Sequence, residues 1–157
     1  ARTGETLNAV WDEIDLDSKT WTIPADRMKA KKEHVVPLAA RSIEILKELE
    51  QLRSSKWVFP GQKLNRPLSN MAMSNVLKRM KIKNVVVHGF RSTFRVWVAE
   101  ETEFATELAE YALAHELVSK VERAYNRTTA PERRRGLMDA WAQFANSSTS
   151  PKATAEQ

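Results

Sequence analysis

The hydrophobic pattern of this chain changes its period once, and that change most constrains the fold. Apolar and polar residues alternate at 10–16, and two further short strand-like segments follow at 20–24 and 34–38, which is typical of β-strands. From residue 39 onward, apolar residues recur every three or four positions, which predicts amphipathic helices. We therefore predict an α+β fold, mainly α-helical, in which a small three-stranded antiparallel sheet precedes a helical bundle.

The helical part is expected to consist of amphipathic helices joined by polar loops. We predict them at 4–10, 39–52, 69–80, 88–101, 102–113, 116–126 and 132–145. Ser69 and Thr102 are the expected N-caps of two of these helices, because their hydroxyls can accept a hydrogen bond from a free backbone N–H. Phe90, Phe94 and Trp97 lie at i, i+4 and i+7, so all three are expected in the core.

The charge balance favours a polyanionic partner. The chain has 25 lysine and arginine residues against 20 acidic ones, a net charge of +5, and cationic side chains that neutralise phosphates release counterions. Cysteine is absent, which excludes disulfides and thiolate metal sites. We expect neither a membrane span nor a secretory leader. The length of 157 residues suits one domain with one core.

Several side chains near predicted helix ends could carry chemistry. His88 and Arg91 lie at i and i+3 in H-G-F-R, on one face of a helix start where backbone N–H groups also favour a phosphate. Tyr125 follows ten residues after His115, and a tyrosine hydroxyl attacks poorly without a base or cationic neighbours. Taken singly, each is more simply explained as a helix cap, a surface ion pair or a packed tyrosine. His34, on the third predicted strand, is expected to be structural.

The order of these signals is specific, although each is weak alone. In chain order they are Arg2 in A-R-T-G-E, Lys29 in a β-hairpin, His88 and Arg91 in H-G-F-R, His115 in L-A-H and Tyr125 in A-Y-N-R. Their order and spacing resemble the signature of the tyrosine recombinase, or phage-type integrase, family. The segments H-V-V-P-L, V-F-P-G and P-E-R-R-R-G-L-M-D-A-W-A resemble its phage and genomic-island branch. The resemblance extends from residue 1 to about 146.

This resemblance implies site-specific DNA recombination, in which a mobile element is integrated or excised. Tyr125 would attack the scissile phosphorus and form a 3′-phosphotyrosyl bond, and Lys29 would protonate the departing 5′-oxygen. The sequence has no metal-ligand cluster and no glycine-rich phosphate loop, so no metal ion, nucleotide or other cofactor is expected.

The resemblance also assigns roles to the remaining site residues. Arg2 and Arg91 would grip the non-bridging oxygens of the phosphate, because a guanidinium binds phosphate bidentately and keeps its charge. His88 would hydrogen-bond the phosphate or accept the tyrosine proton, and His115 would donate to a non-bridging oxygen. Glu5 resembles the acidic partner that steadies the site.

Two assignments have alternatives. Lys31 or Lys32 could replace Lys29, which we prefer because it lies eight residues before the proline of H-V-V-P-L, as the family's lysine does. Tyr111 lies four residues before His115 and could be the nucleophile, but A-Y-N-R resembles the segment that carries it in the family.

The resemblance also divides the chain and names its partners. Residues 1–130 would form a catalytic domain truncated at its N-terminus, 131–146 a C-terminal helix, and 147–157 a disordered tail. In the family the segment after the tyrosine packs on a neighbouring subunit, and we expect Leu137, Trp141 and Phe144 to do so. The expected partners are double-stranded attachment sites, a homotetramer on DNA and DNA-bending accessory proteins, in the bacterial cytoplasm with the nucleoid.

The chain departs from the family pattern at its start. Helices normally precede the first arginine, and N-terminal DNA-binding domains normally accompany the catalytic domain. We therefore expect Arg2 to be poorly fixed and the fragment to be a monomer that binds DNA weakly, with weak or no activity. A non-catalytic DNA-binding or assembly module, and a type IB topoisomerase-like nicking-closing enzyme, are the alternative functions.

Overall fold

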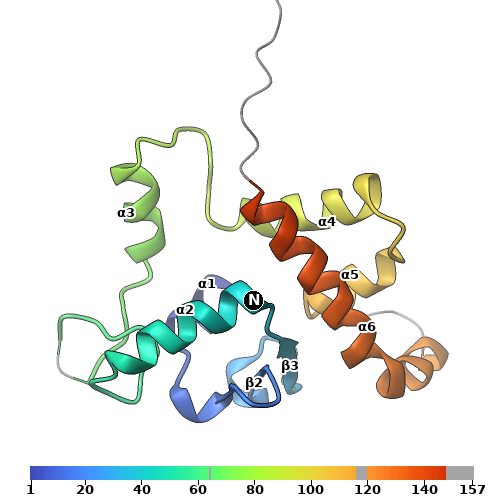
Figure 1. Ribbon diagram of the computed structural model, residues 1–157, viewed down its shortest axis with the longest axis horizontal. Coiled ribbons are helices and arrows are strands. Elements are labelled where there is room, and N and C mark those ends of the chain that lie inside the picture. Colours follow the sequence, from blue (N-terminus) through green and yellow to red (C-terminus); the bar gives the residue numbers. More distant parts are fainter. Residues whose placement is uncertain (64, 116–119, 148–157) are drawn as a thin grey trace, which may run out of the picture.

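A computed structural model describes residues 1–63, 65–115 and 120–147, and it describes residues 120–131 by their backbone only. The predicted α+β fold is confirmed: a small three-stranded antiparallel sheet accompanies a mainly helical chain (Figure 1). The helices are α1 (Thr3–Leu7), α2 (Ala40–Gln51), α3 (Ala72–Arg79), α4 (Gly89–Glu101), α5 (Thr106–Ala112) and α6 (Lys120–Asn146). No helix among the described residues is long and apolar enough to cross a membrane.

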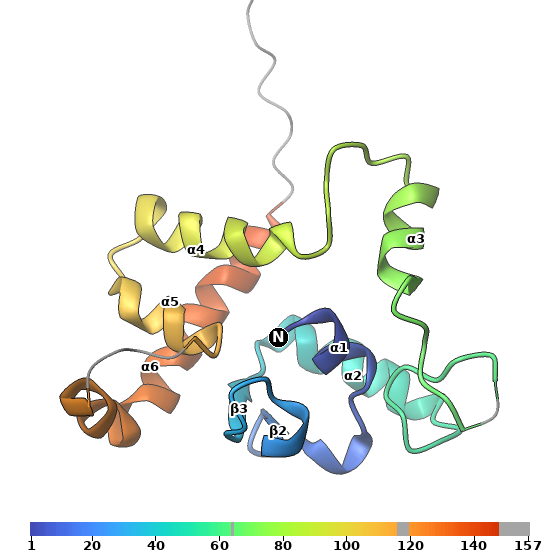
Figure 2. The ribbon, with the colours of Figure 1, turned by 180° about the vertical axis from the view of Figure 1, so that it is seen from behind.

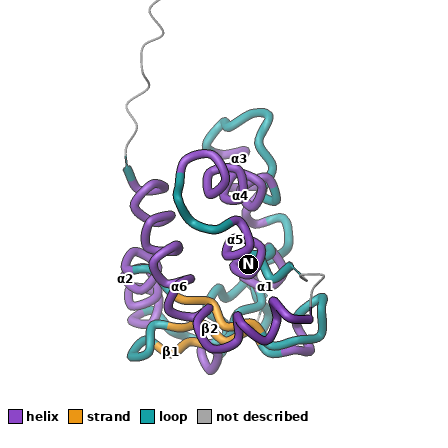
Figure 3. Tube along the Cα trace, turned by 90° about the vertical axis from the view of Figure 1, so that its right-hand side faces the viewer, coloured by secondary structure: helices purple, strands orange, loops and turns teal. Residues whose placement is uncertain are grey.

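The sheet is a meander of β1 (Ile14–Asp15), β2 (Thr20–Ile23) and β3 (His34–Pro37), with β2 in the centre. Its register pairs Trp21 with Ile14 on one side and with Val36 on the other. In Figure 3 the strands lie at one end of the molecule, with helices above them. The sheet therefore forms the base of the fold and carries the loop between β2 and β3.

The strand predicted at 10–16 is mostly wrong. Residues Trp11–Glu13 form a 3₁₀ turn, η1, and only Ile14–Asp15 pair with β2. The cause is Glu13, whose carboxylate turns inward and accepts a hydrogen bond from the Trp21 indole Nε1 at 3.0 Å. Glu13 also pairs with Arg27. These polar contacts bend a segment whose alternating pattern predicts an extended strand.

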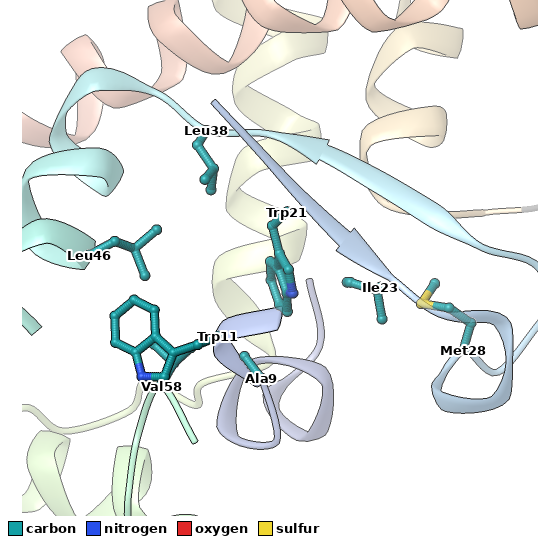
Figure 4. Packing of buried hydrophobic residues seen from close by; sticks show 8 residues of the cluster. All are labelled: Ala9, Trp11, Trp21, Ile23, Met28, Leu38, Leu46 and Val58. Carbon is teal, nitrogen blue, oxygen red and sulfur yellow. The ribbon is translucent and has the colours of Figure 1, made fainter. Parts of the chain in front are cut away.

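One apolar core lies between the sheet, α2 and the residues after α1 (Figure 4). Its buried members are Ala9, Trp11, Trp21, Ile23, Met28, Leu38, Leu46 and Val58. Ile23 is fully buried, and burying one such aliphatic side chain contributes roughly 1.5–3 kcal/mol. This core fixes the residues after α1 and Met28 of the β2–β3 connection relative to each other.

A second core joins α4, α5 and α6, which lie together in Figures 1 and 2. Its buried members are Phe94, Trp97, Val98, Leu108, Ala109, Leu113 and Leu137. The burial predicted for Phe94 and Trp97 is confirmed, but that of Phe90 is wrong, because its side chain is 51% exposed. The second core starts at Phe94, and Phe90 instead borders a cavity described below.

The predicted caps are also wrong. α3 begins after Met71 and α5 after Ala105, with no side-chain capping bond at either. Thr102 ends α4, where its hydroxyl donates to the Val98 carbonyl at 2.7 Å. A threonine hydroxyl can bond the carbonyl four residues earlier as readily as a following N–H, so its type alone does not show which end of a helix it closes.

The two helices predicted at 116–126 and 132–145 are replaced by the single helix α6. The predicted break at 128–131 is wrong. Proline disrupts a helix interior by removing one backbone hydrogen bond, but α6 contacts α5, β3 and α2, and such packing outweighs local preference. Residues 148–157 of the predicted tail lie outside the described residues.

Candidate active site

Arg91 and His115 come together where the start of α4 meets the end of α5. The Arg91 Nη2 donates to the Leu113 carbonyl at 2.7 Å and lies 3.2 Å from His115 Nε2. Both residues border a cavity of about 350 Å³. Its lining residues are His88, Arg91, Ser92, Arg95, Glu110, Leu113 and His115. Three residues singled out in the sequence, His88, Arg91 and His115, therefore share one cleft.

The position of His115 depends on a left-handed residue. Ala114 has a φ of 52° and ends α5, and the His115 N–H then donates to the Glu110 carbonyl at 2.9 Å. This bond from a residue to the carbonyl five positions earlier is typical of a helix that closes through a left-handed residue. It folds His115 back over the last turn of α5, toward the start of α4.

His88 connects this cleft to a second cavity beside α1. The second cavity has a volume of about 250 Å³, and its lining includes Thr3 and Thr6 of α1 as well as His88 and Arg91. His88 is exposed and immediately precedes α4. Because His88 and Arg91 border both cavities, the start of α1 lies next to the Arg91–His115 cleft.

Arg2 is held at the start of α1 by Glu5. Its backbone N–H donates to Glu5 Oε2 at 2.5 Å, and its Nη1 donates to Glu5 Oε1 at 2.8 Å. Burial would raise the pKa of the Glu5 carboxyl, but these hydrogen bonds from Arg2 outweigh it and lower that pKa. In the described structure Arg2 is thus anchored, in contrast to the weak fixation expected from the sequence.

In the described part of the chain, the Arg91 guanidinium keeps one donor unpaired, although the Glu5 and Glu110 carboxylates act on it from nearby. Its Nη1 is buried, and among the described residues it has no hydrogen-bond partner. Burial, followed by the nearby Arg2 guanidinium, lowers the pKa of Arg91. An unpaired buried cationic donor is costly, whereas an anion in the cleft would satisfy it. The arrangement therefore suits binding of a phosphate or a similar oxyanion.

A bracing contact that the sequence did not indicate links α1 to the β2–β3 connection. Arg27 pairs with Glu13, and its Nη2 donates to the backbone carbonyl of Glu5. Arg27 lies 22 residues from Glu5 in sequence, and no periodic pattern relates residues at such a distance. The only signal in the sequence was the segment R-M-K at 27–29, which also resembles the phage and genomic-island branch of the family. Arg27 positions the helix start that carries Arg2.

Lys29 is not brought into the cleft. It is exposed in the connection between β2 and β3 and does not line either of the two cavities described above. The neighbouring Lys31 has a φ of 52°, and its Nζ lies 3.4 Å from the Asp26 carbonyl. Met28 of this connection is buried in the first core, but the residues at 29–33 after it are mostly exposed and belong to neither core. Which lysine serves the site stays a prediction.

The proposed nucleophile lies on α6, whose backbone includes residue 125. The side chain of Tyr125 is outside the described part of the structure, so its distance from Arg91 stays untested. The alternative, Tyr111, is half-buried on α5. From residue 132 onward the side chains of α6 are described. In this part the helix is held by Leu137, which is fully buried, and by Arg135, whose Nη2 donates to the Ser18 carbonyl at 3.1 Å.

His34 lies on β3 near α6. Burial, then the Arg134 guanidinium, lowers its pKa from 6.5 to about 4, while a hydrogen bond with the Ala112 backbone and then the Glu5 carboxylate oppose this change. A histidine that folds in its neutral form fits the structural role expected for it.

We expect His34 to make the fold sensitive to acid. Because its folded pKa of about 4 lies below the unfolded value of 6.5, the unfolded chain binds more protons in this window, and stability falls as pH decreases. The slope would be at most about 1.4 kcal/mol per pH unit. Urea denaturation between pH 7 and 4.5 measures it. His34→Gln should have a shallower slope than wild type, and equal slopes would contradict the assignment.

The chain is similar to known proteins over most of its length. The chain matches the model of the Phage integrase family over residues 1–132. It is 38% identical to the prophage integrase IntA of Escherichia coli strain K12 over 152 residues, which is 95% of this chain and 37% of that protein. It is 34% identical to prophage integrase IntZ of the same strain over 149 residues, 93% of this chain and 37% of that protein.

A further relative is the integrase of Enterobacteria phage P4, 31% identical over 161 residues, 91% of this chain and 37% of that protein. The chain thus spans about 37% of the length of these relatives. No solved structure matches it significantly. Because the family match runs from Arg2 through Tyr125 and includes every residue that lines the Arg91–His115 cleft, the chain belongs to the phage integrase family.

Proposed function

We propose that this chain is the catalytic region of a tyrosine site-specific DNA recombinase, which integrates or excises a mobile element at attachment sites in double-stranded DNA. The observation that carries the proposal is Arg91, which borders a cleft shared with two histidines and whose buried Nη1 has no partner among the described residues. A phosphodiester is an anion that such a cleft would bind. The family match supports the same conclusion.

The proposed reaction exchanges one phosphodiester for another. The Tyr125 Oη attacks the scissile phosphorus, the bond to the 5′-oxygen breaks, and the tyrosine proton passes to His88 or to solvent. The product is a 3′-phosphotyrosyl bond and a free 5′-hydroxyl. A 5′-hydroxyl from a second strand then attacks the phosphotyrosine and releases the tyrosine. The number of phosphoester bonds is conserved, so the reaction needs no ATP.

The cleft residues would stabilise the charge that develops on phosphorus. Arg2 and Arg91 would bind the non-bridging oxygens, His115 would donate to one of them, and Lys29 would protonate the leaving 5′-oxygen. Positioned cationic donors in a partly dehydrated site are the main source of catalysis in phosphoryl transfer. For Lys29, the exposed β2–β3 connection would have to move toward the cleft when DNA binds.

The proposed assembly is a tetramer on DNA, aided by DNA-bending accessory proteins and acting on the bacterial nucleoid. In the described chain, Trp141 packs within the same chain, with its ring 5.3 Å from that of Phe94 and 5.2 Å from that of Trp97. Phe144 is 45% exposed at the end of α6. We propose that the end of α6 exchanges this contact for the same surface of a neighbouring subunit.

The exchange predicts that Phe144→Ser weakens self-association of the full-length protein on DNA by about tenfold, with a smaller loss of fold stability than Trp141→Ala. An aromatic ring at an interface contributes roughly 1–2 kcal/mol, and in one chain the Phe144 ring is 45% exposed and packs on the rings of Trp97 and Trp141 at 5.3 and 5.5 Å. Trp141→Ala should weaken association too, with a loss of fold stability. Analytical ultracentrifugation with attachment-site DNA measures both. Unchanged association in both variants would refute packing in trans.

The proposed function is tested with a suicide substrate, an attachment-site duplex nicked near the cleavage point so that religation fails. The full-length protein, including any segment that precedes residue 1, is incubated with this DNA and analysed on a denaturing gel. We expect a covalent protein–DNA band in which the protein is joined to a 3′-phosphate and the released strand carries a 5′-hydroxyl.

Other outcomes decide between the alternatives. Sequence-independent relaxation of supercoiled DNA, without strand exchange between sites, would favour a topoisomerase-like nicking-closing enzyme. Specific DNA binding without any covalent band would favour a non-catalytic binding module.

A further inference from the structure

The carboxylate of Glu110 contacts the Nδ1 nitrogen of the His115 ring. Its Oε2 is 2.5 Å from His115 Nδ1, and its Oε1 accepts a hydrogen bond from Arg95 Nε at 2.5 Å. The Glu110 side chain is 19% exposed, against 40% for that of His115. Nothing in the family signature quoted above includes Glu110 or Arg95.

These contacts decide where the proton of His115 lies. Burial would raise the pKa of Glu110, but hydrogen bonds from His115 and Arg95 outweigh it and lower that pKa, so Glu110 is a carboxylate. A carboxylate only accepts hydrogen bonds, and therefore Nδ1 carries a proton. The Arg91 Nη2, 3.2 Å from Nε2, can only donate. In the DNA-free chain these contacts favour the tautomer in which Nδ1 carries the ring proton and Nε2 is the acceptor.

In its proposed role, His115 must carry a proton on Nε2, the atom that is an acceptor in the DNA-free chain. To donate to a phosphate oxygen, Nε2 must gain a proton, and this proton comes from solvent. The ring then becomes a cation beside Arg91. The bound phosphate compensates this charge on one side, and the Glu110 carboxylate compensates it at Nδ1 on the other.

We propose that Glu110 is a positioning residue that fixes His115 with Nδ1 protonated and allows its Nε2 to become a donor to the scissile phosphate. Only one part of this inference, the donation from His115 Nε2 to the scissile phosphate, rests on the proposed function. Among the described residues, the other charged or titratable groups that line the cleft with His115 are Glu110 of α5, Arg91 and Arg95 of α4, and His88 just before α4. Of these groups, only Glu110 supplies negative charge.

The first test is independent of activity. In ¹⁵N NMR spectra of the DNA-free chain above pH 7, His115 is expected as the tautomer with Nδ1 protonated. In Glu110→Gln this preference should weaken, because a neutral amide replaces the carboxylate. Glu107→Gln is the matched control, since Glu107 lies exposed on the same helix. A wild-type His115 that carries its proton on Nε2 would overturn the proposal, whether or not the protein cleaves DNA.

The second test uses the rate of covalent adduct formation on the suicide substrate. Glu110→Gln is expected to form adduct about 10- to 100-fold more slowly at pH 8, as is typical when the partner of a functional histidine is removed, while DNA binding changes less than about threefold. The deficit should shrink toward pH 6, where solvent supplies the proton more readily. Glu107→Gln should behave like wild type at both values.

A double-mutant comparison separates this role from a structural one. In a His115→Ala background, Glu110→Gln should have almost no further effect on the rate. An equal loss in both backgrounds, or a deficit that does not depend on pH, would show that Glu110 acts on the fold and not through His115. If the wild-type protein forms no adduct, the proposed function fails, and the NMR result still decides the tautomer.

Discussion

Tyr125→Phe is expected to abolish the covalent protein–DNA band while leaving DNA binding intact. Phenylalanine keeps the ring and removes only the Oη that would bond to phosphorus, so no phosphotyrosyl bond can form. Loss of a nucleophile typically lowers a rate by about 10⁴-fold or more. The measurement compares adduct formation on the suicide substrate with gel-shift affinity for the same duplex. Equal affinity with no adduct identifies Tyr125 as the nucleophile.

Tyr111→Phe is the matched control, because it removes a hydroxyl from the other tyrosine of the chain. Tyr111 is half-buried on α5, so its loss should cost at most about 1 kcal/mol of stability and leave the adduct unchanged. A band that persists in Tyr125→Phe and disappears in Tyr111→Phe would move the nucleophile to α5. In that case A-Y-N-R would have only a structural role.

The elements that the sequence predicted correctly are those in which one local pattern decides the structure. β2 and β3 were expected from short apolar runs, and α2 and α4 from residues spaced by three or four positions. Each buries one face against a core, so the period and the structure coincide. The cleft around Arg91 and His115 was expected for another reason: the resemblance relates residues that lie 24 positions apart.

The errors arose where a polar contact or a single backbone angle decides the structure. Glu13 bends an alternating segment into η1 through its contacts with Trp21 and Arg27. Glu110 and His115 are five positions apart, a spacing that puts them on different sides of a straight helix. Only the left-handed Ala114 brings them together. An alanine at this position does not indicate a left-handed backbone angle, because glycine is the residue that usually indicates one.

Arg91→Met is expected to reduce adduct formation by about 10²- to 10³-fold, the typical effect of removing one preorganised donor to a developing negative charge. Arg91→Lys should recover only part of this loss, because an ammonium cannot bind phosphate as a planar fork. The rate on the suicide substrate measures both. Arg41→Met is the control for loss of positive charge, since Arg41 is 49% exposed on α2.

The same substitution should leave the free energy of unfolding within about 1 kcal/mol of wild type. Arg91→Met loses the bond to the Leu113 carbonyl, which contributes roughly 1.5–3 kcal/mol as a charge-assisted hydrogen bond. It also removes a buried, unpaired Nη1 and the repulsion by Arg2, which together cost a similar amount. Urea denaturation measures the balance.

The sign of the stability change separates two roles for Arg91. If Arg91 is kept for phosphate binding, the DNA-free fold carries an unsatisfied cation, and Arg91→Met is neutral or stabilising. If Arg91 mainly braces α4 against the end of α5, the variant loses several kcal/mol and its low activity reflects unfolding. A destabilised Arg91→Met whose activity recovers on cooling, in proportion to the folded fraction, would therefore contradict the proposed phosphate-binding role.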